Sequence, residues 1–301
     1  MSLRFTAALL FLTACDGGPN DTDTGDAGPA LRVFGDFVNT TTAYVGDSTC
    51  IGTDLGTVDP AKQVTATLNG LVIDFQSDDE VPDADVRMWL GDDISGDPDL
   101  ELASDASGAF STRLPTCTPI AYGTSTDPLL ELTVDTYEVH QVFGFDEDGV
   151  LDGEWVRSVS EVTAKLIPGI IGVDWDRTTG IIAGTAYDCN RAEEGVYGHA
   201  QMYIHDAAGA TPATGDVFYF SNSLPQAKED QPDTNPEDGL WVAVNVPVGT
   251  WVVEMWGYNG TDYTMLGSTS LNILAGSVNI SNIYTGHTDG IAYPDSCLQV
   301  M

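Results

Sequence analysis

Basic residues are scarce in this chain of 301 residues, which has ten Lys and Arg against 46 Asp and Glu and a formal net charge of -36. Ten scattered cations cannot form the basic surface that binds nucleic acid, so nucleic acid is excluded as a partner. Disorder of the whole chain is excluded as well, because 42% of the residues are hydrophobic and can bury a core.

Catalytic motifs are also missing. The sequence contains no Gly-x-Ser-x-Gly elbow, no phosphate-binding loop and no dinucleotide fingerprint. The four histidines are His140, His199, His205 and His287, and no pair of them is separated by a single residue. Tyr137 with His140, and Tyr203 with His205, are isolated pairs for which we predict no metal role. The sequence therefore predicts a protein that is not an enzyme.

The apolar run near the N-terminus is short, covering about eight residues after Arg4, which is typical of a secretory signal. It is too short to span a bilayer. Its end, Leu12-Thr13-Ala14-Cys15, resembles the lipobox of bacterial lipoproteins, in which the cysteine is joined to diacylglycerol. The resemblance implies a signal peptide over residues 1–14 and attachment to a lipid bilayer through Cys15.

Residues 15–30 contain neither an aromatic nor a branched aliphatic residue, and they include four aspartates. Such a segment cannot offset its ordering entropy, so we predict a flexible acidic tether. The chain is then exported and lipid-anchored to the bacterial cell envelope. An Asp after the lipidated cysteine, as at Asp16, favours inner-membrane retention in some bacteria, but the rule varies among bacteria. The location can therefore be the outer membrane, the cell surface or the periplasmic leaflet.

Four further cysteines remain, Cys50, Cys117, Cys189 and Cys297. An even number in an exported chain predicts two disulfides. Three connectivities are open, and pairing Cys50 with Cys117 and Cys189 with Cys297 is the economical one because each bridge stays within one half of the chain. A zinc site is disfavoured because no Cys-x-x-Cys pair occurs.

From Ala30 onward, short runs rich in Val, Ile, Thr, Trp and Tyr alternate with Gly, Pro and Asp clusters, which predicts an all-β fold. Residues 158–166 are the one weak helix candidate, and their Val and Thr content favours a strand. The run at residues 271–283 predicts two closing strands around Ala275-Gly276, with Cys297 fixing the tail.

An ordered set of motifs occurs twice in the chain. The first set is Gly70-x-x-x-Asp74, Pro82-x-Ala84-x-Val86, Asp105-x-x-Gly108-x-Phe110 and Leu114-Pro115. The second set is Gly184-x-x-x-Asp188, Val196 to Ile204, Asp238-Gly239-x-Trp241 and Val246-Pro247. In the first set, Ala84, Val86 and Met88 alternate with Asp85, Arg87 and Trp89, which places the two groups on opposite faces of one strand.

This ordered set resembles the carboxypeptidase regulatory-like domain, a transthyretin-like (Ig-like) β-sandwich, over about residues 64–143 and 179–285. The resemblance implies two tandem sandwiches, at residues 31–143 and 179–301, joined by an apolar and therefore packed connector over 144–178. The whole chain also resembles bacterial surface lipoproteins that carry such domains. The zinc peptidase that usually accompanies the domain needs His-x-x-Glu, which is absent.

We expect no cofactor, with one candidate exception. Asp146, Asp148 and Asp152 surround a turn-forming Gly149, and carboxylate oxygens at such spacing are suited to Ca²⁺. The spacing does not complete an EF-hand loop, so a solvated acidic turn is the favoured interpretation.

One strand face is a candidate for binding. Trp251, Val253 and Met255 are expected to face the core and to leave Glu254, Trp256 and Tyr258 on the other face, where two aromatic rings beside an acid could hold a sugar. Packing of this face within the protein is the favoured interpretation. On another strand, the face formed by His199, Gln201, Tyr203 and His205 is expected to be solvated.

The sequence thus predicts a membrane-anchored envelope lipoprotein that acts as a non-enzymatic structural or interaction module. A carbohydrate-binding surface module is the alternative. The partners expected are the bilayer, envelope proteins or polysaccharide.

Overall fold

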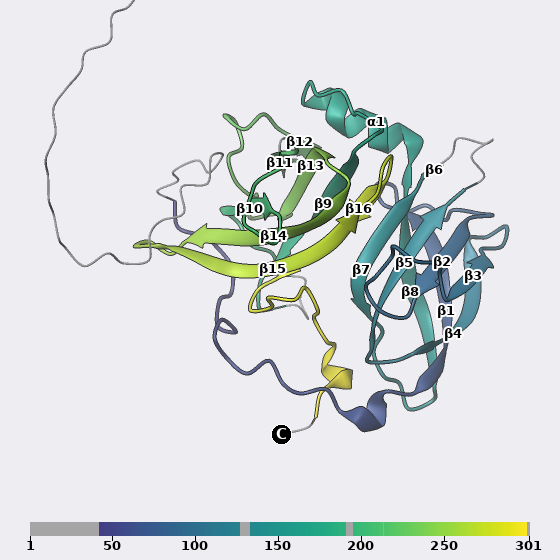
Figure 1. Ribbon diagram of the computed structural model, residues 1–301. Coiled ribbons are helices and arrows are strands. Elements are labelled where there is room, and N and C mark those ends of the chain that lie inside the picture. Colours follow the sequence, from purple (N-terminus) through teal and green to yellow (C-terminus); the bar gives the residue numbers. More distant parts are fainter. Residues whose placement is uncertain (1–41, 127–132, 191–194, 213, 300–301) are drawn as a thin grey trace, which may run out of the picture. The chain divides into compact units, whose positions relative to one another are not determined.

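The computed structural model describes residues 42–126, 133–190, 195–212 and 214–299. Cys15, the signal segment 1–14 and the tether 15–30 lie outside the described residues. The described chain is built mostly of strands, as the all-β prediction requires (Figure 1). None of its helices is long and apolar enough to cross a membrane.

The strands of the first half are β1 (Thr65–Asp74), β2 (Asp85–Trp89), β3 (Leu100–Ala103), β4 (Ala109–Pro115), β5 (Pro119–Ser125), β6 (Thr133–Val134), β7 (Thr136–Val142) and β8 (Val150–Ser160). Those of the second half are β9 (Gly180–Tyr187), β10 (Ala200–His205), β11 (Asp216–Ser221), β12 (Leu224–Pro225), β13 (Leu240–Val246), β14 (Gly249–Tyr258), β15 (Tyr263–Ile273), β16 (Val278–Ile280) and β17 (Ile283–Tyr284). The helices are η1 (Pro60–Lys62), α1 (Glu161–Ile170) and η3 (Asp295–Cys297).

The repeated motifs fold into strands that pair in the same order. In the first strand set, β1 pairs antiparallel with β4 and parallel with β8, while β2, β5 and β7 form an antiparallel series. In the second strand set, β9 pairs antiparallel with β13 and parallel with β16, while β10, β14 and β15 form the matching series. The similarity of the motifs therefore corresponds to a repeated strand topology.

One strand joins the two sets. β16 pairs in parallel with β9 on one side and with β7 on the other, so that Val278 lies opposite both Ile181 and Thr136. A ten-stranded sheet therefore runs through both sets, in the order β12-β11-β13-β9-β16-β7-β5-β2-β3 with β17 paired to β9. The other sheets have the orders β4-β1-β8-β6 and β10-β14-β15.

The alternation predicted for β2 is present, and residues of its two faces belong to two different hydrophobic cores. Ala84, Val86 and Met88 are fully buried in the core of the first strand set. Trp89 points the other way and joins a second core formed mainly by residues of β9, β10, β13, β14 and β15. The second set thus covers the part of the outer face of the first set that carries Trp89, Ala121, Tyr137 and Val139.

The connector at 144–178 contains a strand and a helix. β8 lies beside β1 in the four-stranded sheet, and α1 follows it directly. The strand favoured for residues 158–166 is therefore wrong beyond Ser160. The hydroxyl of Ser160 accepts a hydrogen bond from the Thr163 amide at 3.1 Å, which caps the new helix, and Glu161 adds a favourable charge at its N-terminus.

Two glycines of the repeated motif lie where other atoms of the protein come too close to leave room for a Cβ. A Cβ at Gly70 of β1 would lie 2.5 Å from the Phe110 ring, and one at Gly184 of β9 would collide with the carbonyl oxygen of Ser281. The side chain of any other residue would displace the Phe110 ring at Gly70 and the backbone of Ser281 at Gly184.

Gly184→Ala is accordingly expected to lower the free energy of unfolding by about 1 to 3 kcal/mol. Urea unfolding followed by tryptophan fluorescence measures the change. Gly96→Ala is the matched control, because a Cβ there meets no atom within 4 Å. Equal midpoints for the two variants would contradict the role given to Gly184.

The described cysteines form two disulfides, Cys50–Cys189 and Cys117–Cys297. The pairing within each half, favoured from the sequence, is wrong. The N-terminal segment runs beside the second strand set, where Val45 pairs with Gly198, and the C-terminal tail returns to the segment before β1, where Leu298 pairs with Val58. Each bridge therefore links the two halves.

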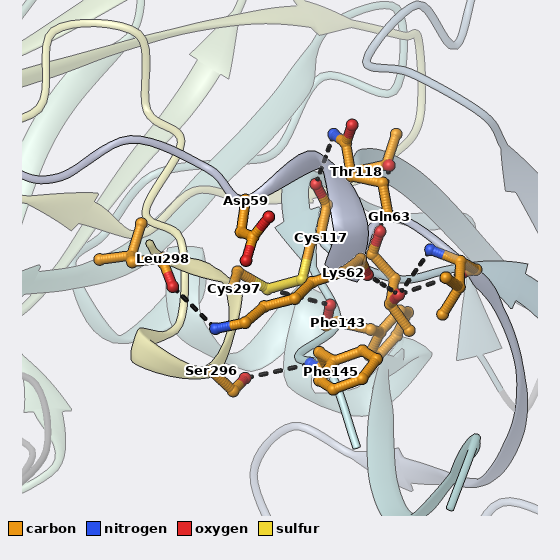
Figure 2. Close-up of a disulfide and its surroundings, with 12 residues drawn as sticks. Asp59, Lys62, Gln63, Cys117, Thr118, Phe143, Phe145, Ser296, Cys297 and Leu298 are labelled. Carbon is orange, nitrogen blue, oxygen red and sulfur yellow. Dashed lines mark hydrogen bonds between the residues drawn. A yellow bond between two sulfur atoms is a disulfide. The ribbon is translucent and has the colours of Figure 1, made fainter. Parts of the chain in front are cut away.

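The tail bridge is held by a local network, shown in Figure 2. The Lys62 ammonium donates to the carbonyl of Leu298 at 2.7 Å, and the Asp59 amide donates to the carbonyl of Cys297 at 2.9 Å. On the other side, the Phe145 amide donates to the Ser296 hydroxyl at 3.0 Å. The tail thus bonds to segments before β1 and after β7.

Candidate functional site

The strand face considered for sugar binding lies on β14. Val253 and Met255 are fully buried in the core, and Trp251 packs against it. Glu254, Trp256 and Tyr258 alternate with them on the other face and are half-buried. The predicted alternation is therefore present in β14, whose neighbours are β10 and β15.

The carboxylate of Glu254 is already engaged within the protein. It accepts a hydrogen bond from the Trp256 indole at 2.9 Å, and its other oxygen lies 3.2 Å from Nε2 of His205. The ring of Tyr203 stacks on that of His205 with 5.0 Å between centroids. Glu254 and Trp256 are thus bonded to each other, and both carboxylate oxygens of Glu254 already have partners within the protein.

The solvated face expected on β10 is wrong for two of its residues. Gln201 is 3% exposed and His205 is 8% exposed, whereas His199 and Tyr203 are half-buried. His199 lies 3.1 Å from the carboxylate of Asp233, which is itself buried. Burial raises the pKa of Asp233, and the hydrogen bond and charge of His199 act in the opposite direction. Alternation indicates which residues share a face, but it does not indicate what covers that face.

The calcium candidates do not converge. The Asp146 carboxylate accepts a hydrogen bond from the Asp148 amide at 2.9 Å, and Gly149 completes the turn with a φ of 67°. Asp152 instead accepts a hydrogen bond from the Asn69 side chain at 2.7 Å. Over the described parts of the chain, no group of three or more His, Cys, Asp or Glu is placed to hold a metal ion.

His140 and Tyr137 also make separate contacts. The His140 ring lies 3.0 Å from Asp92 and 2.6 Å from the carbonyl of Ser270 on β15. Burial alone lowers the pKa of His140, but the hydrogen bond and charge of Asp92 outweigh it and raise the pKa. Tyr137 instead lies beneath the Arg87 guanidinium, 5.3 Å from its ring centroid. The pair is not a joint ligand set.

A buried acid that the sequence did not single out lies where the two strand sets meet. Glu138 of β7 is 4% exposed. One oxygen accepts a hydrogen bond from the Tyr122 hydroxyl on β5, and the other accepts one from the Asn282 side chain at 3.2 Å. Burial raises the pKa of Glu138 to about 7, although the Tyr122 hydrogen bond and the Arg157 charge oppose this shift.

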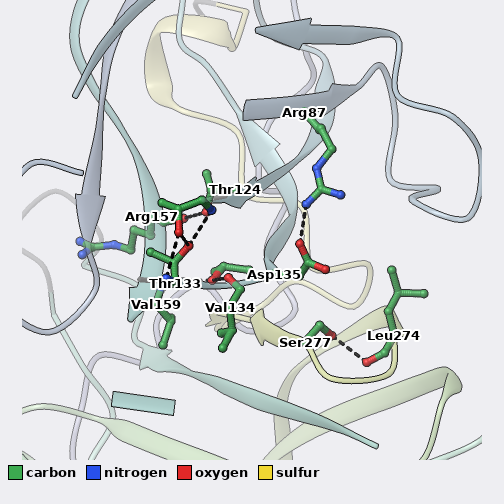
Figure 3. Close-up of polar contacts among 11 residues, drawn as sticks. Arg87, Thr124, Thr133, Val134, Asp135, Arg157, Val159, Leu274 and Ser277 are labelled. Atoms are coloured by element: carbon green, nitrogen blue, oxygen red, sulfur yellow. Dashed lines mark hydrogen bonds and ion pairs between the residues drawn. The ribbon is translucent and has the colours of Figure 1, made fainter. Parts of the chain in front are cut away.

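Further polar contacts join elements of the first strand set, and Figure 3 shows those of Thr124 with Arg157 and of Arg87 with Asp135. The Tyr122 hydroxyl accepts a hydrogen bond from the Arg157 amide at 3.0 Å. The Thr124 hydroxyl donates to the Arg157 carbonyl at 2.8 Å, and Arg87 pairs with Asp135 at 2.9 Å. No sequence signal marked Glu138, because a single acid within a strand usually faces water.

Comparisons with known proteins provide no family. No family model matches this chain, and no curated protein matches its sequence. Among solved structures, the chain is similar to the TIE protein of Bacillus anthracis, with 15% identity and a TM-score of 0.25 over 74% of this chain and 34% of that one. It is also similar to the shaft pilin SpaA from Lactobacillus rhamnosus GG, with 10% identity and a TM-score of 0.24 over 76% and 100% of the two chains.

The major pilin subunit BcpA of Bacillus cereus has 10% identity and a TM-score of 0.22, over 74% of this chain and 100% of the pilin. This chain spans about a third of the length of the TIE chain that it matches. At TM-scores of this size the superpositions carry no argument about fold or function.

Proposed function

We propose that this chain is an exported, lipid-anchored module of the bacterial cell envelope with a structural or interaction role and no catalytic role. The observation that carries the proposal is the pair of disulfides that link the two halves of the chain. Stable disulfides of this kind belong to oxidising compartments outside the cytosol. The lipobox resemblance at Cys15 supplies the anchor.

We further propose that the folded part consists of two tandem transthyretin-like sandwiches, at residues 31–143 and 179–301, with β8 of the intervening segment 144–178 completing a sheet of the first one. The repeated pairing order of the two strand sets supports this division. The shared strand β16 and the two bridges couple the sandwiches, which suits a module that holds a fixed shape outside the cell.

Carbohydrate binding on β14 receives less support, because the carboxylate that would accept sugar hydroxyl groups is bonded to Trp256. A glycan array with the full chain tests it directly. Envelope proteins remain the proposed partners, and crosslinking in intact cells followed by purification of the chain would identify them.

Lipidation is tested by producing the full chain in a bacterial host supplied with radiolabelled palmitate. The unchanged chain is expected to carry label and to fractionate with membranes, whereas Cys15→Ala should lose the label because the acceptor thiol is gone. Thr6→Ala in the apolar run is the matched control and should keep the label. Label retained by Cys15→Ala would contradict the anchor.

A further inference from the structure

A cavity of about 340 Å³ lies between α1 and strands of the second set. On one side, Leu166, Ile167 and Ile170 of α1 line it, and on the other side lie residues of β11, β12, β13 and β16. Its volume is in the range of pockets that bind small molecules. We refer to this cavity as the α1 pocket.

The inner end of the α1 pocket is apolar. A smaller space of about 20 Å³ shares the residues Phe75, Thr163, Ile167 and Ile280 with it. The other residues around that space are all aliphatic, from β8, α1, β9, β13 and β16. A space of this size takes only the end of a hydrocarbon chain, and its aliphatic wall leaves no polar group of that end unpaired.

The rim of the α1 pocket exposes apolar side chains that the fold leaves uncovered. Leu166 is 46% exposed and Ile170 41% exposed, one turn apart on α1. Across the opening, Leu224 is 47% exposed at the start of β12, following the turn residues Asn222 and Ser223, which have positive φ. A ligand with an apolar body would cover both sides of this rim and so remove their surface from water.

The polar end of the α1 pocket carries a guanidinium, that of Arg157. Among the described residues, the guanidinium pairs with Asp78 at 3.5 Å and lies 5.8 Å from the centroid of the Phe75 ring. A guanidinium has five N–H donors, and a single ion pair at this distance leaves most of them for an acceptor that enters the pocket. The Arg157 charge also acts on the buried Glu138, whose partner Asn282 lines the pocket.

We propose that the α1 pocket binds a small hydrophobic carboxylate, with its apolar body against α1 and its anionic group on Arg157. The bound carboxylate replaces Asp78 at the guanidinium, and the side chain of Asp78, which is 68% exposed, turns to water. This property is independent of the anchor and of the structural role proposed above.

Calorimetric titration of the full chain with dodecanoate tests the proposal, using Cys15→Ala as the background so that no attached acyl chain competes. Saturable binding at one site per chain is expected. Dodecanol, which has the same body without the charge, is expected to bind about tenfold more weakly. Absence of saturable dodecanoate binding, or equal binding of the alcohol, would overturn the proposal.

Matched variants locate the site. Leu166→Asp and Arg157→Gln are each expected to weaken dodecanoate binding by about tenfold or more, the first by charging the rim and the second by removing the donor. Their controls are Val162→Asp, which alters an exposed residue of the same helix outside the pocket, and Arg113→Gln on β4. Both controls should bind as the unchanged chain does.

Asp78→Asn is expected to raise the affinity for dodecanoate, a result that misfolding of the variant cannot produce. It removes the competing carboxylate from Arg157, so dodecanoate should bind about threefold or more tightly. Unchanged or weaker binding by Asp78→Asn, or full binding by Leu166→Asp, would show that dodecanoate does not occupy the α1 pocket in the proposed way.

Discussion

Replacing Cys117 and Cys297 together by alanine is expected to lower the free energy of unfolding by about 5 kcal/mol. The bridge closes a segment of 180 residues, so its removal frees a large number of conformations in the unfolded chain. Both cysteines are fully buried, and alanine replaces them without adding a polar group. Urea unfolding of the oxidised proteins measures the difference.

A reducing agent provides the control for this variant. It should lower the stability of the unchanged chain by opening both bridges, and it should lower the variant further only through Cys50–Cys189. A variant that also lacks Cys50 and Cys189 should not respond to the agent at all. If the Cys117/Cys297 variant unfolds at the same urea concentration as the unchanged chain, the stabilising role of the tail bridge is wrong.

The stability of the unchanged chain is expected to fall by about 3 kcal/mol through Glu138 alone as the pH rises from 4.5 to about 7. Burial raises the pKa of this carboxyl from its ordinary 4.5 to about 7, so the folded chain holds the proton more tightly than the unfolded chain. The contribution is fully present below pH 4.5 and is lost as the pH passes 7. Glu138→Gln removes this dependence.

The measurement is the free energy of unfolding against pH for the variant and for the unchanged chain. In Glu138→Gln the side-chain amide can face the Asn282 group that now donates to a carboxylate oxygen. The variant is then less stable than the unchanged chain by an amount that does not depend on pH. The informative quantity is therefore the change in the difference between the two curves. Glu101→Gln, an exposed acid on β3 of the same sheet, is the control and should give a curve parallel to that of the unchanged chain. A parallel curve for Glu138→Gln would refute the assignment.

The sequence predicted the strands well because their signals are local. Alternation in β2 and β14 placed Val86, Met88, Val253 and Met255 inside, and all four are fully buried. The closing strands around Ala275-Gly276 are present as the end of β15 and as β16. The repeated motifs also marked strands that pair in the same order, since the same turn and strand signals recur in both sets.

The disulfide pairing and the burial of several polar residues were not predicted, because they depend on contacts between distant parts of the chain. The disulfide pairing follows from the course of the N-terminal segment and the tail, which no spacing of cysteines records. The burial of Gln201 and Glu138 reflects which surfaces meet, and the polar partners of Glu138 come from β5 and from residue 282. The start of α1 had a local signal in the Ser160 cap, but the Val and Thr content of the segment outweighed it.

The two bridges are interlaced: in chain order, the second begins inside the loop closed by the first and ends beyond it. A protease that cuts the backbone once, anywhere between Cys50 and Cys297, therefore leaves two pieces that are still covalently joined by at least one bridge. Bridges confined to each half would have let a single cut between Cys117 and Cys189 separate the halves. Outside a cell, where proteases cut exposed loops, the nicked protein stays in one piece.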